Sequence, residues 1–320
     1  MSLLVDYFPY FAPYGDELLD LRVNLLRDHV DYFVIAESSR THSGKPVPYM
    51  FPRAAERLSL PMHKIIYVQD EIPDDADLVV QEIDILNTYE NAWRDQAQRL
   101  ASQRARVRER LQKDALLQAL ERFPDDTVFI HSDYDEIINP RENLRYIADR
   151  CRQHPDRIYK LPMVLLESRA DLRVHDRATN APVAWDHSAF VATKRQLQRA
   201  TPTQIRSERQ MPFEIHHITE NGVVCQDLGW HFSWMGGGKT RQVKSQSYAH
   251  FQDGFSWMPQ DQFTSFQDPR FQQWTQQHQY QDGSIPPSGN RDQVLRNYPS
   301  QCLPSQIFEK ESLRNFFFAQ

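Results

Sequence analysis

The chain of 320 residues is 40% hydrophobic and 12% aromatic, so it is long enough to bury a substantial core, and one large domain is expected. Its formal net charge is −6, which excludes the strong positive field by which nucleic-acid-binding proteins attract their partner. Three widely spaced cysteines, no recognisable signal peptide and no apolar window long enough to span a bilayer favour a cytoplasmic protein without a transmembrane segment.

The amino-terminal part is predicted to contain one helix and two strands. Residues 16–27 are rich in leucine and begin with two acids, which is typical of a helix. Residues 30–37 form an apolar run that ends at Glu37, and residues 64–68 form a second run, so both are predicted to be strands. The polar segment 38–48 between them contains glycine and two prolines and is predicted to be a loop.

Residues 82–122 contain neither glycine nor proline, which predicts one or two helices. Six arginines recur within residues 94–110 of this segment, at positions 94, 99, 104, 106, 108 and 110. Because acids are interspersed among them, we expect a solvated helical face. Contact of one or two of these arginines with a phosphate is the alternative.

The segment 128–138 joins an apolar run, predicted to be a buried strand, to the acids Asp133, Asp135 and Glu136. Unpaired carboxylates are too costly to bury, so we expect the chain to reach a cleft at Asp133, where open α/β sheets bind their ligands. Carboxylate oxygens suit Mg²⁺ or Mn²⁺, which keep positions open for the phosphates of a substrate. Acidic strings also occur at ordinary turns, but the strand before these acids and the helix start at Pro140 favour a metal site.

The second half of the chain changes in character along its length. Residues 140–151 are predicted to form a helix and residues 158–167 another apolar strand. From about residue 171 onward short strands and loops are expected. The last segment, 256–320, is rich in glutamine and proline, but its aromatic residues offer too much apolar area for a solvated tail, so we expect an ordered cap.

A second group of candidate site residues lies in the segment 228–239. His231 stands between aromatic residues on a predicted strand, where it is either a core histidine or a ligand of the metal held by the aspartates. The glycines at 236–238 can bring backbone N–H groups near anionic oxygens, and Lys239 can neutralise a diphosphate at a helix start. These glycines lack the spacing of a P-loop, so they are weak evidence alone.

Four blocks of this sequence together resemble glycosyltransferase family 17. They are Glu37-Ser-Ser-Arg-Thr-His-Ser-Gly-Lys-Pro46, Ser132-Asp-Tyr-Asp-Glu-Ile137, Gly229-Trp-His-Phe-Ser-Trp234 and Lys244-Ser-Gln-Ser-Tyr-Ala-His250. Their order and approximate spacing match the family over residues 15–300. Agreement of several motifs in order is more specific than any one of them, and the family includes β-1,4-mannosyl-glycoprotein N-acetylglucosaminyltransferases.

The resemblance implies a GT-A-like, Rossmann-related α/β fold. It would be a single glycosyltransferase domain over residues 1–320, with a central mixed sheet and an aromatic-rich C-terminal cap. A nucleotide-sugar-binding half is expected over 1–140, an acceptor and metal-site half over 141–255, and the cap over 256–320.

The resemblance also implies an inverting transfer from a nucleotide-diphosphate sugar, with a UDP-sugar as the expected donor and GlcNAc as one candidate sugar. A Mn²⁺ or Mg²⁺ ion would bridge the diphosphate to the protein. The metal ligands would be Asp133, Asp135 and His231. The residues expected near the donor are Glu37, Lys45, Lys239, Lys244 and His250.

Inversion requires a carboxylate that accepts the proton of the acceptor hydroxyl. Four acids on or after predicted strands of the second half are candidates: Glu167, Asp186, Glu214 and Asp227. Asp227 is the closest of them in sequence to His231.

The acceptor and two alternative functions stay open at the level of sequence. The first predicted helix begins close to Met1, unlike in animal members with an anchor and stem, so a glycan or lipid-linked saccharide is expected in place of a luminal N-glycan. The same acids would also suit a metal-dependent hydrolase or nucleotidyltransferase acting on nucleotide sugars. Alternatively, the tryptophans would stack on sugars in a non-catalytic glycan-binding protein.

Overall fold

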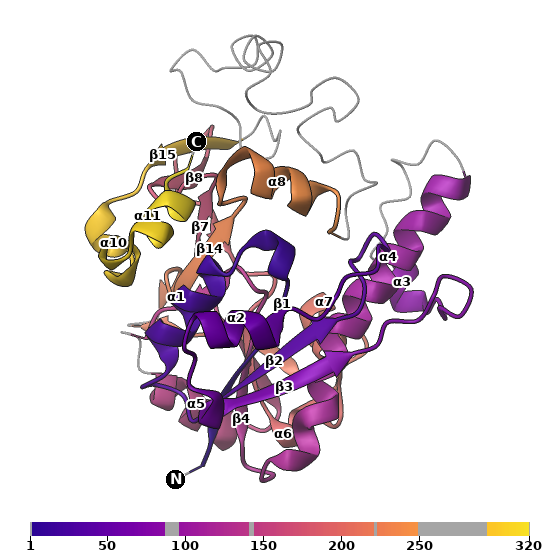
Figure 1. The fold of residues 1–320 in the computed structure, drawn as a ribbon. Coiled ribbons are helices and arrows are strands. Elements are labelled where there is room, and N and C mark those ends of the chain that lie inside the picture. The colour runs from indigo at the N-terminus through magenta and orange to yellow at the C-terminus, as the bar shows by residue number, and fades with distance from the viewer. Residues whose placement is uncertain (1, 87–95, 141–143, 221–222, 249–292, 320) are drawn as a thin grey trace.

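The structure, a computed structural model, describes residues 2–86, 96–140, 144–220, 223–248 and 293–319. These residues form two mixed β-sheets with helices packed against them, so the predicted α/β class is confirmed (Figure 1). His250 and the first part of the predicted aromatic cap fall in 249–292, outside the described residues.

The larger sheet has seven strands in the order β11-β6-β10-β4-β1-β2-β3. β1 to β4 run parallel, whereas β10 pairs antiparallel with both β4 and β6. In chain order the strands are β1 (Leu4–Tyr10), β2 (Tyr32–Ser38), β3 (Ile65–Asp70), β4 (Val128–His131), β6 (Arg157–Lys160), β10 (Phe190–Thr193) and β11 (Glu214–His217). The strand order reverses between β1 and β4, and ligands of open α/β sheets bind at the carboxyl ends of strands at such a point.

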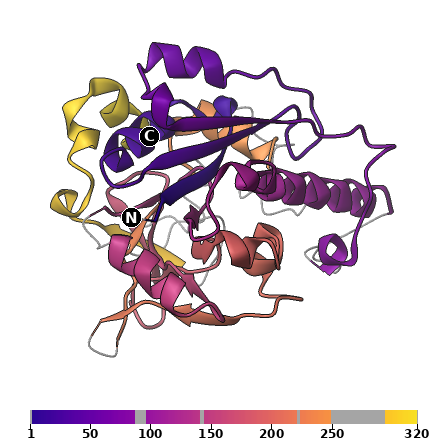
Figure 2. The same cartoon turned by 90° about the horizontal axis from the view of Figure 1, so that it is seen from below.

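Both faces of this sheet are buried, as the apolar runs in its parallel strands require. One face packs against α1 (Glu17–Leu26), α2 (Phe51–Arg57) and α5 (Leu144–Gln153). The other packs against the 3₁₀ helix η4 (Ala115–Arg122), α6 (Lys194–Leu197) and α7 (Pro202–Ser207). The long helix α4 (Gln96–Asp114) leads into η4 and is seen at one side of the sheet in Figure 2.

The smaller sheet has the order β15-β8-β7-β14-β5, and β9 pairs with β7. Its strands are β5 (Glu136–Ile138), β7 (Met163–Glu167), β8 (Leu172–Asp176), β9 (Ala184–Trp185), β14 (Gly229–Ser233) and β15 (Gln293–Asn297). A separate hairpin joins β12 (Thr219–Glu220) to β13 (Val223–Val224). The other helices are η1 (Ala12–Tyr14), η2 (Met62–Lys64), α3 (Glu82–Leu86), α8 (Gly237–Ser245), η6 (Ser300–Cys302), α10 (Gln306–Glu309) and α11 (Glu311–Phe317).

Two segments that begin with apolar runs are each divided between the two sheets. The segment 128–138 passes from β4 to β5 through a polar turn. The segment 158–167 passes from β6 to β7 at Pro162, which has no N–H to continue a ladder. The strand predicted before Asp133 is β4, whereas the prediction of one strand over 158–167 was wrong, because an apolar run does not reveal a change of sheet.

The central strand β1 was not predicted. Its run Leu-Val-Asp-Tyr-Phe-Pro-Tyr is interrupted by Asp6 and Pro9. Asp6 is nevertheless fully buried, because the guanidinium of Arg22 lies 2.7 Å from its carboxylate. Glu37 therefore lies near the end of β2, the second strand in chain order, and not in the first strand.

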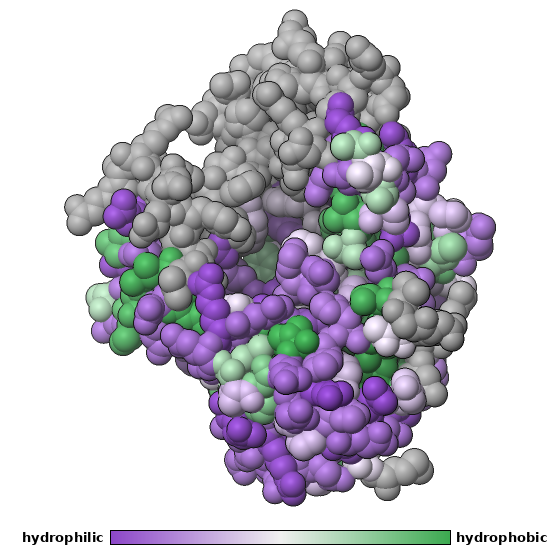
Figure 3. All heavy atoms as spheres, turned by 180° about the vertical axis from the view of Figure 1, so that it is seen from behind, coloured by the Kyte–Doolittle hydropathy of each residue, from purple (hydrophilic) through white to green (hydrophobic). Residues whose placement is uncertain are grey.

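The surface carries little contiguous apolar area on the face seen in Figure 3, which is mostly hydrophilic with small hydrophobic groups. Among the described residues, no helix combines the length and the apolar character needed to cross a bilayer. The three cysteines, Cys151, Cys225 and Cys302, all lie in the described part of the chain and form no disulfide bond.

Candidate active site

The predicted acids lie in the connection between the two sheets. Asp133 and Asp135 follow the carboxyl end of β4, and Glu136 begins β5. Because β5 pairs antiparallel with β14, the register places His231 opposite Glu136 and thus beside Asp135. Both aspartates line a cavity of about 410 Å³. The chain therefore reaches a cleft at Asp133, as expected from the cost of burying unpaired carboxylates.

Charged and aromatic side chains line this cavity. Its cations are Arg40, Lys113, Arg206 and Lys244, and its carboxylates are Glu109, Asp133 and Asp135. Its aromatic rings, apart from histidines, are Phe11, Tyr14, Tyr134, Trp185, Trp234 and Tyr248. With histidine neutral, the described lining has one cation more than carboxylates, which favours an anionic ligand.

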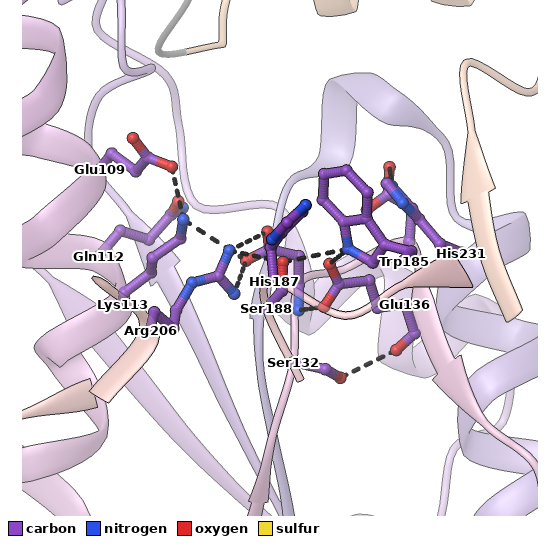
Figure 4. A network of polar contacts seen from close by, with 12 residues as sticks. Glu109, Gln112, Lys113, Ser132, Glu136, Trp185, His187, Ser188, Arg206 and His231 are labelled. Atoms are coloured by element: carbon purple, nitrogen blue, oxygen red, sulfur yellow. Dashed lines mark hydrogen bonds and ion pairs between the residues drawn. The ribbon is translucent and has the colours of Figure 1, made fainter. Parts of the chain in front are cut away.

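Asp133 is held by cations from two helices. Arg206 of α7 donates to both carboxylate oxygens, at 3.0 and 2.8 Å, and the Lys113 ammonium of α4 lies 3.8 Å from Oδ1. Arg206 also donates to the Ser188 hydroxyl at 2.9 Å (Figure 4). Burial alone would raise the pKa of Asp133, but the positive charges of Arg206 and Lys113 outweigh burial and lower this pKa.

Asp135 is paired with a different cation. The ammonium of Lys244 on α8 lies 2.6 Å from Oδ2, and the same oxygen lies 3.6 Å from Nε2 of His231. Burial opposes ionisation of Asp135, yet Lys244 and then His231 outweigh burial and hold its pKa far below the usual range. Asp135 is therefore a carboxylate at every pH at which the protein is expected to work.

His231 is buried and faces Asp135 on one side. Its ring packs on Trp185, with 4.4 Å between the ring centroids. Its Nδ1 is buried and makes no hydrogen bond to any described residue. A buried nitrogen without a partner is costly, so this ring differs from a core histidine whose polar atoms are satisfied.

Glu136 organises the turn and does not face the cavity. Its side chain is fully buried, and one oxygen accepts the backbone N–H of Asp133 at 2.9 Å. The other oxygen accepts the indole N–H of Trp185 at 2.5 Å (Figure 4). Glu136 thus fixes the position of the first aspartate and of the ring on which His231 packs.

Arg22 of α1 also binds this turn through hydrogen bonds. Its guanidinium donates to the Ser132 hydroxyl at 2.7 Å and to the backbone carbonyls of Asp133 and Glu136, both at 2.9 Å. Its remaining donors bind Asp6 of β1. The sequence contains the signal for this role, since Arg22 is a lone arginine within a leucine-rich helix, but it was not recognised.

Of the five residues predicted near the donor, Lys244 lines the cavity. Glu37 lines a second cavity of about 280 Å³, and its carboxylate accepts the N–H groups of Met50 and Phe51 at the start of α2, at 2.8 and 3.0 Å. Lys45 and Lys239 are exposed and do not line either cavity in the described structure. His250 lies outside the described residues.

The four carboxylates that were predicted as proton acceptors do not lie together in one site. Asp186 pairs with His187, whose Nδ1 lies 3.3 Å away and which lines the cavity. Glu167 is buried at the end of β7, whereas Glu214 and Asp227 are exposed. Among the described residues, none of the four carboxylates is itself part of the cavity lining.

The cations that bind Asp133 were missed because they come from distant segments. Within the arginine-rich helix α4, Arg106 pairs with Glu109 and Arg110 with Asp84, and it is Lys113 that reaches the cavity. The start of α7 is signalled by a capping box at Thr201, but nothing in the sequence shows that Arg206 turns toward the aspartates.

Among the comparisons with known proteins, one with family models supports a glycosyltransferase. The sequence model described as "Glycosyltransferase family 17" matches residues 14–164, a little under half of the chain. This match supports the resemblance to glycosyltransferase family 17 over the residues matched, which contain the first two of the four sequence blocks. A search of curated proteins found no match.

Two solved structures are similar to this chain only at a low level. "Crystal Structure of a Mycobacterial Protein" has 11% identity and a TM-score of 0.32, with 82% of this chain and 83% of that chain covered. "Crystal structure of M. tuberculosis glucosyl-3-phosphoglycerate synthase" has 12% identity and a TM-score of 0.32, with 79% and 81% covered. At these values neither likeness defines the substrate or the mechanism of this chain.

Proposed function

We propose that this glycosyltransferase moves a sugar from a nucleotide-diphosphate donor, a UDP-sugar, to a hydroxyl of a saccharide acceptor with inversion at the transferred carbon. The observation that carries the proposal is the pair Asp133 and Asp135 in a cation-rich cavity at the carboxyl end of β4. A departing nucleoside diphosphate gains negative charge, and fixed cations in a partly closed site stabilise that charge.

The arrangement of the larger sheet supports a GT-A-like fold. Its four parallel strands have the order β3-β2-β1-β4, as in the first part of doubly wound nucleotide-binding sheets. The second cavity, of about 280 Å³, shares Phe11, Arg40 and Gln112 with the first. Its other walls include Tyr10 and Pro48, so it offers an apolar slot beside the cations for the nucleoside of the donor.

Among the described residues no group of three His, Cys, Asp or Glu side chains could hold a metal ion, so the proposed divalent ion would have few protein ligands. Mg²⁺ and Mn²⁺ sites at phosphates commonly use one or two carboxylates and complete their shell with phosphate oxygens and water. Asp135 and His231 would supply two ligands, and Lys244 already places a positive charge against the same oxygen of Asp135. Asp133 would bind the ion only if its pairing with Arg206 opened.

When bound, the ion would supply positive charge next to the departing diphosphate. The chain's own cations add to this charge: Lys113 and Arg206 lie in the same cavity and act on the same developing anion. For proton removal we propose Asp186 with His187, since His187 is the partner that lines the cavity.

The acceptor and the location are also proposals. The rings of Trp185 and Trp234 in the cavity wall favour an acceptor with a sugar face, such as a glycan or a lipid-linked saccharide. A cytoplasmic location agrees with the spacing of the cysteines.

The test is incubation of the purified protein with UDP-GlcNAc, UDP-glucose or UDP-galactose, Mn²⁺ and a panel of saccharide acceptors. Mass spectrometry is expected to detect a glycosylated acceptor and free UDP, and EDTA is expected to abolish both. Metal-dependent release of sugar 1-phosphate without transfer would favour the hydrolase. Binding of glycans with no need for nucleotide or metal would favour the glycan-binding protein.

A further inference from the structure

Lys244 occupies the position that the proposed metal ion would need. Its ammonium lies 2.6 Å from Oδ2 of Asp135, and this oxygen is the one that faces Nε2 of His231. An ammonium and a divalent cation on one oxygen would repel each other strongly in a buried site. The ion can therefore bind between Asp135 and His231 only after the ammonium of Lys244 has moved.

The ammonium of Lys244 has other contacts within the cavity. It lies 3.3 Å from the hydroxyl of Tyr14 and 4.5 Å from the centre of that ring. It also lies 5.1 Å from the ring of Trp234. These electron-rich groups stabilise a cation without neutralising it, so Lys244 would remain in the cavity as a free positive charge after leaving Asp135.

The helix that carries Lys244 is fixed, so the exchange is a movement of the side chain. Arg241, one turn earlier in α8, donates to the backbone carbonyls of Trp234 and Ser168, both at 2.6 Å. At the other end, the N–H of Ser43 donates to the carbonyl of Ser247 at 3.2 Å. A flexible lysine on an anchored helix can change partner while the backbone stays in place.

We infer that Lys244 is an internal counter-ion of Asp135 that gives way to the divalent cation and then pairs with the diphosphate of the donor. The inference rests on the proposed function. This exchange of partners would make the binding of metal and nucleotide cooperative. The metal would free Lys244 to pair with the diphosphate, and pairing with the diphosphate would remove Lys244 from Asp135. By linkage each ligand must then raise the affinity for the other by the same factor.

The test is a Mn²⁺ titration of the full chain, with free Mn²⁺ measured by electron paramagnetic resonance in the absence and presence of UDP. Without UDP, Lys244→Met is expected to bind Mn²⁺ about tenfold more tightly than the wild type, because Asp135 has lost its competing partner. In the same variant, UDP is expected to raise the Mn²⁺ affinity by a smaller factor than in the wild type, because only the direct binding of the ion to the phosphate oxygens remains. Lys239→Met, on the exposed side of the same helix, is expected to match the wild type.

The charge-preserving Lys244→Arg variant separates this role from a structural one. It is expected to keep the weak Mn²⁺ binding without UDP that the wild type shows. The inference is overturned if the wild type binds Mn²⁺ and a folded Lys244→Met variant binds it no more tightly. The proposed function would still stand in that case. A wild type that binds no Mn²⁺ even with UDP overturns the proposed metal site and this inference together.

Discussion

Two aspartates separated by a single residue differ in their partners, and this difference sets their roles. Asp133 forms a bidentate ion pair with the planar guanidinium of Arg206. Asp135 faces a flexible lysine and an imidazole with an unpaired nitrogen. A mobile partner is easier to exchange for an ion, so Asp135 is the aspartate that we assign to the metal.

His231 provides a prediction for a single residue. His231→Gln keeps a side chain of similar length but removes the imidazole next to Asp135. We expect at least a tenfold loss of Mn²⁺ affinity in the presence of UDP, with a melting temperature within a few degrees of the wild type. Calorimetric titration and thermal unfolding of the same preparation check both parts. A variant that unfolds with no selective loss of metal would mark His231 as a structural residue.

Asp70 provides a second prediction, which concerns stability. Burial raises the pKa of this carboxyl to about 6, although Ser38 and Gln118 donate to it at 3.0 and 3.2 Å. The folded state thus holds the proton more tightly than the unfolded chain, and stability falls as the pH rises from about 4 to about 6. We expect Asp70→Asn to stabilise the protein at pH 8 by about 1 to 3 kcal/mol and to have little effect at pH 4.

Denaturant unfolding at the two pH values measures this difference. Asp77 is exposed, so Asp77→Asn is the matched control. This variant is expected to change the free energy of unfolding only slightly, and by the same amount at pH 4 and pH 8. An Asp70→Asn variant that is destabilised at pH 8 would show that the carboxylate of Asp70 supports the fold.

At the scale of elements, the site depends on the pairing of β5 with β14. This ladder carries the turn with Asp135 on one strand and His231 on the other. It also depends on close approach at Gly229, where a Cβ atom would lie 2.5 Å from the carbonyl oxygen of Ile137. The two strands could not stay this close with any larger residue.

Gly229→Ala is therefore expected to separate the two strands and to destabilise the protein by about 1 to 3 kcal/mol. Because His231 is two residues further along β14, Mn²⁺ affinity should also fall. Urea unfolding and metal titration measure the two effects. Unchanged stability would mean that β5 and β14 can shift apart without cost and that their close contact does not position the site.

At the scale of the whole molecule, the parts of the fold that could be predicted are those with a signal in a short stretch of sequence. The apolar run that ends in Asp133 and Asp135 predicted both the strand and the cleft, since buried strands cannot carry unpaired acids. The four local blocks that resemble glycosyltransferase family 17 implied the α/β class. The second sheet was not foreseen, because the segments that change sheet carry the same apolar pattern as continuous strands.

The site itself was only partly predictable. Asp133, Asp135, His231 and Lys244 belong to the motifs and all line the cavity. Arg206 reaches Asp133 across 73 positions of sequence, and its contact depends on how α7 packs on the sheet. Such long-range pairings leave no local pattern, so the contacts of Arg206 and Lys113 with Asp133 could be found only in the folded chain.

The proposed function requires a divalent ion at Asp135 that holds the donor diphosphate. Thermal unfolding of the wild type and of Asp135→Asn with UDP, with and without Mn²⁺, tests this claim most directly. We expect saturating UDP to raise the melting temperature of the wild type by about 5 °C only when Mn²⁺ is present. We expect no such rise for Asp135→Asn, whose circular dichroism spectrum should match that of the wild type. An equal, Mn²⁺-dependent rise in the folded variant would contradict the account.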